Sequence, residues 1–181
     1  AQAFYDITPD LSCFGKALAN GFSVSALAGR REFMRLGGLD HTDRPRVFLL
    51  STTHGAETHS LAAAIATLQV YENEPVIEHL ERQGEKLRRQ AESVISRHGL
   101  GGYVAISGRA SCLLYSTLDR DRKPSQAMRT LLLQETIRRG ILMPSLVVSY
   151  SHTDEDIEKT IEALDGALGI GRNLHERARA T

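Results

Sequence analysis

The chain has 181 residues, of which 41% are hydrophobic, and its 22 basic and 22 acidic side chains give a formal net charge of zero. Because it contains no basic block and no apolar run near the roughly 20 residues of a membrane span, we expect neither a nucleic-acid-binding nor a membrane-spanning protein. Two widely spaced cysteines, Cys13 and Cys112, without a Cys-x-x-Cys motif favour a reducing, cytoplasmic location.

The first distinctive segment surrounds Lys16. The apolar run Leu11 to Phe14 predicts a short buried strand, and Gly15 lets the backbone pass close to another group. Asn20-Gly21 predicts a turn, and Phe22 to Ala28 predicts a second short buried strand. If these runs enclose Lys16, its partial desolvation favours the neutral amine, a nucleophile toward carbonyl groups. The alternative is an ordinary exposed lysine in a loop.

A second candidate site follows the apolar run Val47 to Leu50. Residues 51–55 place hydroxyl groups and a glycine before a helix expected to begin near Glu57, and the free amides of a helix start bind anions. The alternative is an ordinary N-cap region. Three histidines, His54, His59 and His152, are candidate metal ligands. His54 and His59 are five residues apart and do not share a helical face, and Glu57 does not complete a His-Glu-x-x-His motif, so we predict no metal site.

The rest of the chain alternates between helical and strand patterns. A helix from Ser60 to Tyr71 is apolar over most of its circumference and is expected to be buried. The next helix, from about Ile77, is amphipathic and ends at Gly99. We expect Thr153 to cap the last helix, and a frayed tail from Arg172 to Thr181. The predicted helices are Ser60 to Tyr71, one with apolar positions from Ile77 to Ile95, Gln126 to Arg139, and a last one that starts within Ser151 to Ile157 and has a buried stripe from Ile157 to Leu168. The predicted strands are Tyr103 to Ser107, Cys112 to Leu118 and two short ones within Ile141 to Tyr150.

The residues around Lys16 resemble the cofactor-lysine segment of class III aminotransferases, and within that class most resemble the glutamate-1-semialdehyde 2,1-aminomutases. The likeness also includes Pro144-Ser145 and the segment from Ser151 to Ile161. One departure is that Leu146 to Ser151 is short and lacks the glutamate-bearing insertion of the aminomutases, which puts mutase chemistry in doubt. The matching residues near the lysine are Asp10-Leu-Ser-x-Phe-Gly-Lys16-Ala-Leu-x-Asn-Gly21 and Ser25-Ala-Leu-Ala-Gly29-Arg-Arg-Glu32.

This resemblance implies the α/β fold of pyridoxal-phosphate (PLP)-dependent transferases, the aspartate aminotransferase fold type I. Residues 1–72 would be the C-terminal part of the large PLP-binding domain, and residues 73–181 the small α+β domain. Lys16 would hold pyridoxal 5′-phosphate as a Schiff base, and Thr53 would contact the cofactor phosphate of the neighbouring subunit in a homodimer. Glu57 and Thr58 depart from the family's Asn-Pro, so no role is transferred to them.

The function implied by the resemblance is amino-group transfer, or its intramolecular version, on a small amine or amino acid. The chain begins without methionine at a point that lies in mid-chain in the family, so we expect the C-terminal part of a longer enzyme, incomplete as a catalyst alone. Two alternatives remain open: a related PLP racemase or decarboxylase, and a truncated, non-catalytic folding or dimerisation module. A visible absorption band on adding the cofactor would separate an enzyme from the module.

Overall fold

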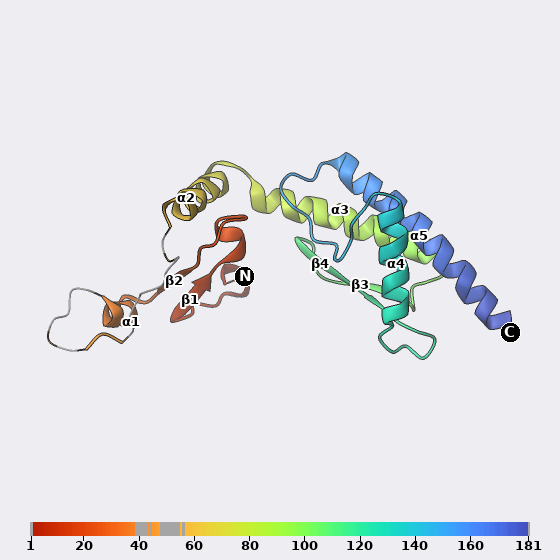
Figure 1. Ribbon diagram of the computed structural model, residues 1–181, viewed down its shortest axis with the longest axis horizontal. Coiled ribbons are helices and arrows are strands. Elements are labelled where there is room, and N and C mark those ends of the chain that lie inside the picture. Colours follow the sequence, from red (N-terminus) through yellow and green to blue (C-terminus); the bar gives the residue numbers. More distant parts are fainter. Residues whose placement is uncertain (1, 39–42, 44, 48–54, 56, 181) are drawn as a thin grey trace. The chain divides into compact units, whose positions relative to one another are not determined.

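The computed structural model describes residues 2–38, 43, 45–47, 55 and 57–180, with side chains described as far as Gly171. The chain divides into two compact units, Ala1–Glu74 (unit 1) and Pro75–Thr181 (unit 2). Each unit has its own secondary structure (Figure 1). None of the helices within the described ranges is both long enough and apolar enough to cross a membrane.

Unit 1 contains a two-stranded antiparallel sheet and one long helix. Strands β1 and β2 pair with Leu11 opposite Gly29 and Phe14 opposite Ala26. After β2 the chain makes a single α-turn and then a 3₁₀ turn. The elements are η1 (Ala3–Tyr5), β1 (Leu11–Phe14), η2 (Lys16–Leu18), β2 (Ala26–Gly29), α1 (Arg31–Met34), η3 (Arg35–Gly37) and α2 (Thr58–Asn73).

The predicted burial of unit 1 is wrong, although its strands and helix are present. Both strands are almost entirely exposed, and β2 starts four residues later than the predicted Phe22. In α2 only Ser60 and Ala64 are buried, while Ile65 is 58% exposed. The described part of unit 1 offers only one small sheet and one long helix, which is too little apolar surface to cover these side chains. The predicted strand at residues 47–50 lies outside the described residues except for Val47.

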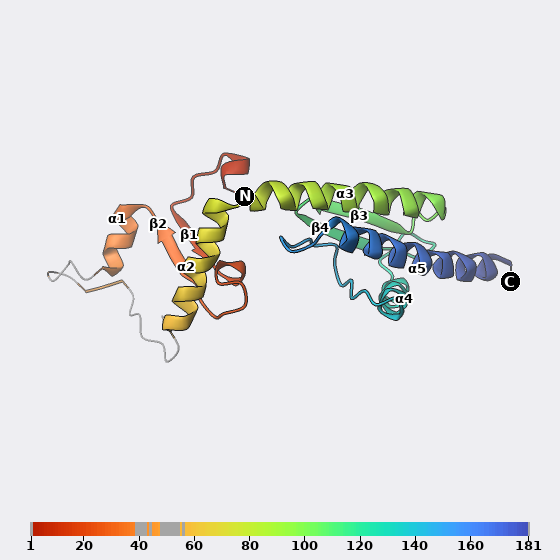
Figure 2. The same cartoon turned by 90° about the horizontal axis from the view of Figure 1, so that it is seen from above.

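Unit 2 contains a β-hairpin and three helices packed around one core. Strands β3 (Val104–Arg109) and β4 (Cys112–Thr117) are antiparallel, with Val104 opposite Thr117 and Arg109 opposite Cys112. Helices α3 (Val76–Arg97) and α5 (Asp154–Ala180) lie side by side, and α4 (Gln126–Arg138) packs against α5 (Figures 1 and 2). All three helices and both strands confirm the predictions. The innermost core residues are Ala91, Leu113, Leu132, Ala167 and Leu168.

Helix α5 begins with the predicted cap. The Thr153 backbone N–H donates to Asp156 Oδ2 at 2.8 Å, and the Asp156 N–H donates back to Thr153 Oγ1 at 3.3 Å. These bonds from Thr153 hold the pKa of the Asp156 carboxyl below its usual value. The predicted fraying from Arg172 is wrong for the backbone, because α5 continues to Ala180 through a stretch rich in the helix formers alanine, arginine and glutamate.

The segment between α4 and α5 does not form the two predicted strands. It makes a single isolated bridge to β4, in which the Leu146 N–H donates to the Leu113 carbonyl at 3.2 Å. Pro144 has no N–H to donate, so a regular ladder cannot extend through it. Leu146 is nonetheless buried, while Leu142 remains 75% exposed.

The turn of the hairpin lies directly on α3. Gly84 of α3 is buried, and a Cβ added there would lie 1.8 Å from the Ala110 carbonyl oxygen and 2.3 Å from its carbon. Ala110, between β3 and β4, is itself 8% exposed. The absence of a side chain at Gly84 therefore permits the backbones of helix and hairpin to touch.

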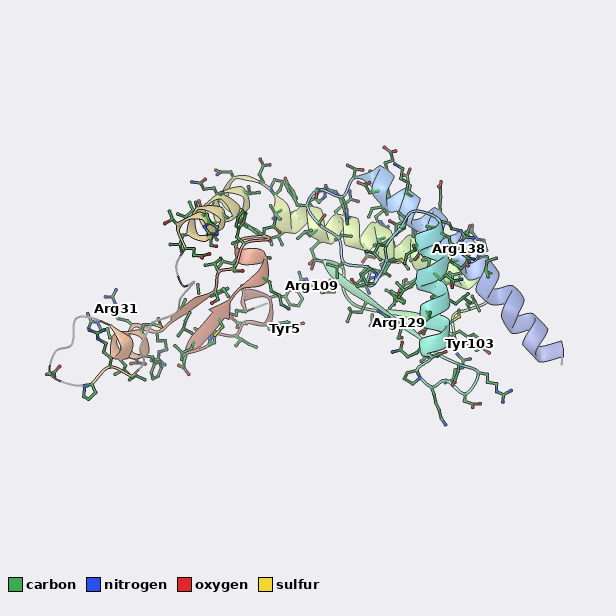
Figure 3. All side chains as sticks on the ribbon, in the orientation of Figure 1. Tyr5, Arg31, Tyr103, Arg109, Arg129 and Arg138 are labelled. Atoms are coloured by element: carbon green, nitrogen blue, oxygen red, sulfur yellow. The ribbon has the colours of Figure 1, made fainter. Side chains whose placement is uncertain are left out.

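Polar side chains on either side of this contact tie α3 to the same turn. Glu81 Oε1 accepts hydrogen bonds from Arg109 Nε, labelled in Figure 3, and from Ser111 Oγ, the latter at 2.9 Å. One turn beyond Gly84, Arg88 Nη2 donates to the Gly108 carbonyl at 2.7 Å. The hydrogen bond from Arg109 above all, and that from Ser111, hold the pKa of Glu81 below its usual value. The hairpin turn is thus fixed by both backbone contact and charge.

Candidate functional site

Lys16 is the first residue of η2, directly after β1 and Gly15. Its φ is +50°, in the left-handed region that residues with a side chain seldom adopt. The side chain is exposed and makes no hydrogen bond or ion pair with any described residue. The predicted enclosure by the two apolar strands is wrong within unit 1, because β1 and β2 are themselves exposed. What the structure offers is an accessible primary amine on a constrained backbone.

The loop that follows Lys16 closes on itself through local hydrogen bonds. The Leu18 N–H donates to the Gly15 carbonyl at 3.1 Å, and the Phe22 N–H donates to the Ala19 carbonyl at 3.3 Å. The predicted turn at Asn20-Gly21 is present, with φ of +46° and +126° at its two residues. Lys16 and Asn20 therefore place two left-handed residues other than glycine in one short loop.

Helix α2 packs against this loop, residues 15–22, which we call the lysine loop. A cavity of about 220 Å³ lies between them, with mostly apolar walls. Ala19, at 2% exposure, and Ala64 of α2 are among the few buried apolar residues of unit 1. Contact with α2 therefore positions the lysine loop within unit 1. The cavity is lined by Phe14, Gly15, Ala17 and Leu18 from the loop side and by Thr67, Leu68 and Tyr71 from α2.

The first turn of α2 also reaches the lysine loop. The His59 ring packs edge-on against the Phe22 ring, with their centroids 5.7 Å apart. His59 Nε2 lies 3.3 Å from Oε2 of Glu57, the N-cap residue of the helix. In the sequence His59 is only a candidate metal ligand, and nothing there indicates this contact, since no local pattern links residues so far apart in the chain.

Thr53, the second predicted site residue, lies outside the described residues, as do residues 51–54 as a whole. The structure therefore does not place its hydroxyl relative to Lys16. The described helix start at Glu57 and Thr58 follows this segment closely and lies beside the lysine loop through His59. Within the part of the chain that is described, no three His, Cys, Asp or Glu residues are grouped as metal ligands.

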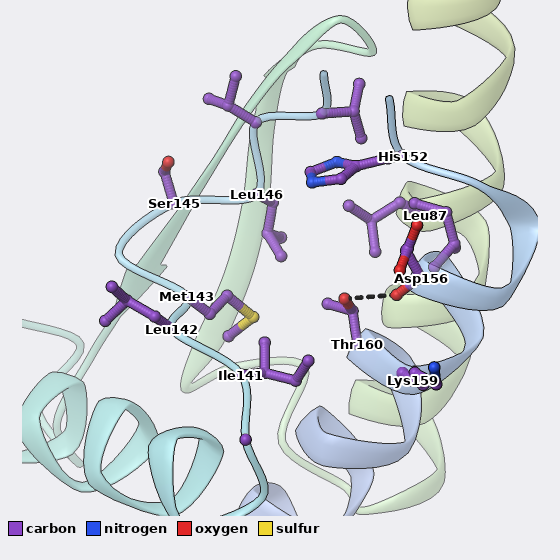
Figure 4. A pocket seen from close by; sticks show the side chains of 14 residues that line it. Leu87, Ile141, Leu142, Met143, Ser145, Leu146, His152, Asp156, Lys159 and Thr160 are labelled. Carbon is purple, nitrogen blue, oxygen red and sulfur yellow. Dashed lines mark hydrogen bonds between the residues drawn. The ribbon is translucent and has the colours of Figure 1, made fainter. Parts of the chain in front are cut away.

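A separate cavity of about 230 Å³ lies inside unit 2, between residues 140–148 and the start of α5. Figure 4 shows Ile141, Met143 and Leu146 on one wall and Leu87 and Thr160 on the other. Thr160 Oγ1 donates to the main-chain carbonyl of Asp156 at 2.7 Å, so it already has an internal acceptor. Polar and apolar groups line this cavity in similar measure.

His152 belongs to the segment from Ser151 to Ile161 that resembles the family, and it is held by hydrogen bonds within unit 2. Its Nδ1 accepts a hydrogen bond from the Ser149 N–H at 3.1 Å. Its carbonyl lies 3.1 Å from Nε2 of His79 and also accepts from Gln83 Nε2 at 3.5 Å. These bonds attach the loop before α5 to α3. Within unit 2 these contacts give His152 a structural role.

Comparison with known proteins assigns the chain to a family. Residues 1–168 match the family model described as aminotransferase class-III. The chain is 32% identical over 172 residues to a 3-aminobutyryl-CoA aminotransferase of Cloacimonas acidaminovorans, covering 93% of this chain and 39% of that protein. It is 28% identical to the glutamate-1-semialdehyde 2,1-aminomutase of Halobacterium salinarum, covering 93% of this chain and 44% of that protein. The chain thus spans about two-fifths of the length of these relatives.

Solved structures give the same picture of the fold. The PLP internal aldimine form of the FumI protein of Sphingopyxis sp. MTA144 superposes with a TM-score of 0.77 at 28% identity, covering 93% of this chain and 38% of that one. A transaminase with PLP bound superposes with a TM-score of 0.81 at 22% identity, over 94% of this chain and 40% of that one. The predicted α/β fold of the PLP-dependent transferases is confirmed. The chain belongs to the class III aminotransferases.

Proposed function

We propose that this chain takes part in PLP-dependent amino-group transfer on a small amine or amino acid, with Lys16 as the residue that holds the cofactor. The observation that carries the proposal is the exposed amine of Lys16 on a left-handed backbone, within the family-matched residues. Relatives named as an aminotransferase and an aminomutase, and a relative solved as a PLP internal aldimine, support this assignment.

The described residues fit such a cofactor. A primary amine without a competing ion pair can bond to an aldehyde carbon, and Lys16 Nζ has no such partner among the described residues. The first backbone N–H groups of α2, beside the lysine loop, have no partner within the helix and are of the kind that binds phosphate. When bound, pyridoxal phosphate supplies an electron sink beside the amine nitrogen. Lys16 would hold the cofactor, and its Nζ, once free, would take up the proton that leaves the substrate carbon.

Reduction with borohydride tests the assignment of Lys16. In the full-length protein loaded with cofactor, reduction followed by peptide mapping should place the pyridoxyl group on Lys16. Lys86 and Lys159 are internal controls, since both are ion-paired in unit 2. A label on either of them, or on Lys123, with Lys16 unlabelled would contradict the assignment.

We also propose that Thr53 binds the cofactor phosphate of the neighbouring subunit in a homodimer. Removing one hydrogen bond to a charged group by Thr53→Ala should weaken cofactor binding by roughly ten- to a hundredfold, or about 1.5–3 kcal/mol. Mixed dimers of Lys16→Ala and Thr53→Ala chains test the geometry. If Thr53 acts across the interface, each mixed dimer holds one doubly defective site and one intact site, and activity is recovered. Mixtures as inactive as their parents would contradict the shared site.

We also propose a reaction type and a compartment for this protein. Between transfer and mutase chemistry we favour transfer, because no acidic residue lies between Leu146 and Ser151. Cys13 and Cys112 are both free and exposed, which suits the reducing cytoplasm. The family match favours neither the racemase or decarboxylase nor the non-catalytic module.

A further inference from the structure

We propose that His59 is a positioning residue for Lys16, acting through the ring of Phe22. The proposal rests on the proposed function in taking Lys16 as the cofactor-binding residue. His59 directly follows Glu57 and Thr58, the two positions at which this chain departs from the Asn-Pro of the class III aminotransferases.

The lysine loop has a conformation that needs external support. Lys16 has a left-handed φ of +50°, which brings its Cβ too close to the backbone, whereas Asn20, at +46°, is of a residue type that tolerates this region. Such conformations persist where the surrounding structure holds them, and they are frequent at functional sites. The direction in which Lys16 leaves the backbone therefore depends on the contacts that fix residues 15–22.

The hydrogen bonds that the loop makes among the described residues do not supply this support. Those from Leu18 to Gly15 and from Phe22 to Ala19 both remain within the loop, so they set its curvature without attaching it to another element. The attachment comes from side chains on α2. Leu68 and Tyr71 line the cavity beneath the first half of the loop, and His59 contacts Phe22 at its far end.

His59 is held so that its ring can perform this role. Nε2 lies 3.3 Å from Glu57 Oε2, which orients the imidazole, and the ring edge meets Phe22 with an angle of 64° between the two planes. An edge-on pair of rings is an attractive and directional contact. The ring lies against Phe22, and Lys16 makes no described contact with it, so His59 acts on the lysine through the loop.

The test uses the full-length protein with pyridoxal phosphate and compares His59→Ala, His59→Phe and His59→Gln. The matched control is Gln69→Ala, at an exposed position of the same helix. The measurements are the rate of borohydride trapping at Lys16, the visible circular dichroism of the bound cofactor and the melting temperature of the cofactor-free protein. His59→Ala should slow trapping about two- to tenfold, the range expected for one aromatic pair. It should also change the dichroic band and leave the melting temperature near that of Gln69→Ala.

Rescue separates the ring contact with Phe22 from the polar contact with Glu57. His59→Phe keeps a ring against Phe22 and should restore trapping and dichroism, whereas His59→Gln keeps a polar group near Glu57 and should not. Phe22→Leu should reproduce the His59→Ala defect, and the double variant should be no worse than either single variant. Additive defects, rescue by glutamine alone, or a His59→Ala protein that matches Gln69→Ala in trapping would overturn the proposal. Trapping at another lysine in the unaltered protein would instead overturn the proposed function.

Discussion

Replacing Lys16 with alanine is expected to lower the rate of amine transfer by roughly 10²- to 10⁴-fold, the usual contribution of a positioned proton-transfer group. The variant loses the amine that holds the cofactor and that takes up the substrate proton. Steady-state transfer from several amino donors, measured with saturating cofactor in the full-length protein, gives the comparison. Lys123→Ala is the matched control, because that lysine lies in the exposed loop between β4 and α4 and should leave the rate unchanged.

Two further measurements make the Lys16 prediction specific. Small primary amines added to Lys16→Ala should restore part of the rate, because a free amine can carry the proton that Nζ carried. Lys16→Arg keeps the positive charge but has no basic amine at neutral pH, so it should be as slow as the alanine variant. Full activity in Lys16→Arg would mean that the residue contributes charge alone, and the proposed role would be wrong.

The second large effect is expected at Gly84. Alanine is the better helix former by about 1 kcal/mol, so Gly84→Ala would stabilise an exposed helix. Here the added Cβ would lie 1.8 Å from the Ala110 carbonyl oxygen, and the obstacle is backbone that cannot rotate away. Overpacking of this kind costs about 1–3 kcal/mol or more, which outweighs the gain in helix propensity. The variant should therefore melt at a lower temperature than the unaltered protein.

A second helical glycine is the control for this prediction. At Gly169 of α5 the nearest atom to an added Cβ is His98 Cε1 at 3.5 Å, an ordinary contact. Gly169→Ala should raise the melting temperature slightly through helix propensity, while Gly84→Ala lowers it. Equal shifts in the same direction would show that α3 and the hairpin turn can separate at little cost, contrary to the packing described above.

The sequence predicted unit 2 well because its signals are local. In α3, apolar residues such as Leu87, Ala91 and Val94 recur at three- and four-residue spacings, and these residues are buried. The cap at Thr153 and the left-handed Gly140 after α4 likewise follow from neighbouring residues. Helices of this kind carry their own boundaries in the sequence, so their position along the chain was predictable.

Unit 1 was less predictable because apolar composition does not say what covers a segment. Leu11 to Phe14 is apolar enough for a buried strand, yet β1 has no second layer over it among the described residues. The contact of His59 with Phe22 joins distant parts of the chain, and neither residue type signals it. The sequence also does not predict the left-handed backbone of Lys16, since lysine has no preference for that conformation. The lysine itself was found through its family resemblance, and its surroundings required the structure.

The single bridge between Leu146 and Leu113 also bears on the solubility of the hairpin. A strand with an open row of N–H and C=O groups can pair with another molecule and start aggregation. On this side of β4, Leu146 already occupies the Leu113 carbonyl, and the adjoining segment contains Pro144, which has no N–H to offer an incoming strand. The irregular connection between α4 and α5 therefore shields one edge of the hairpin from association with other chains.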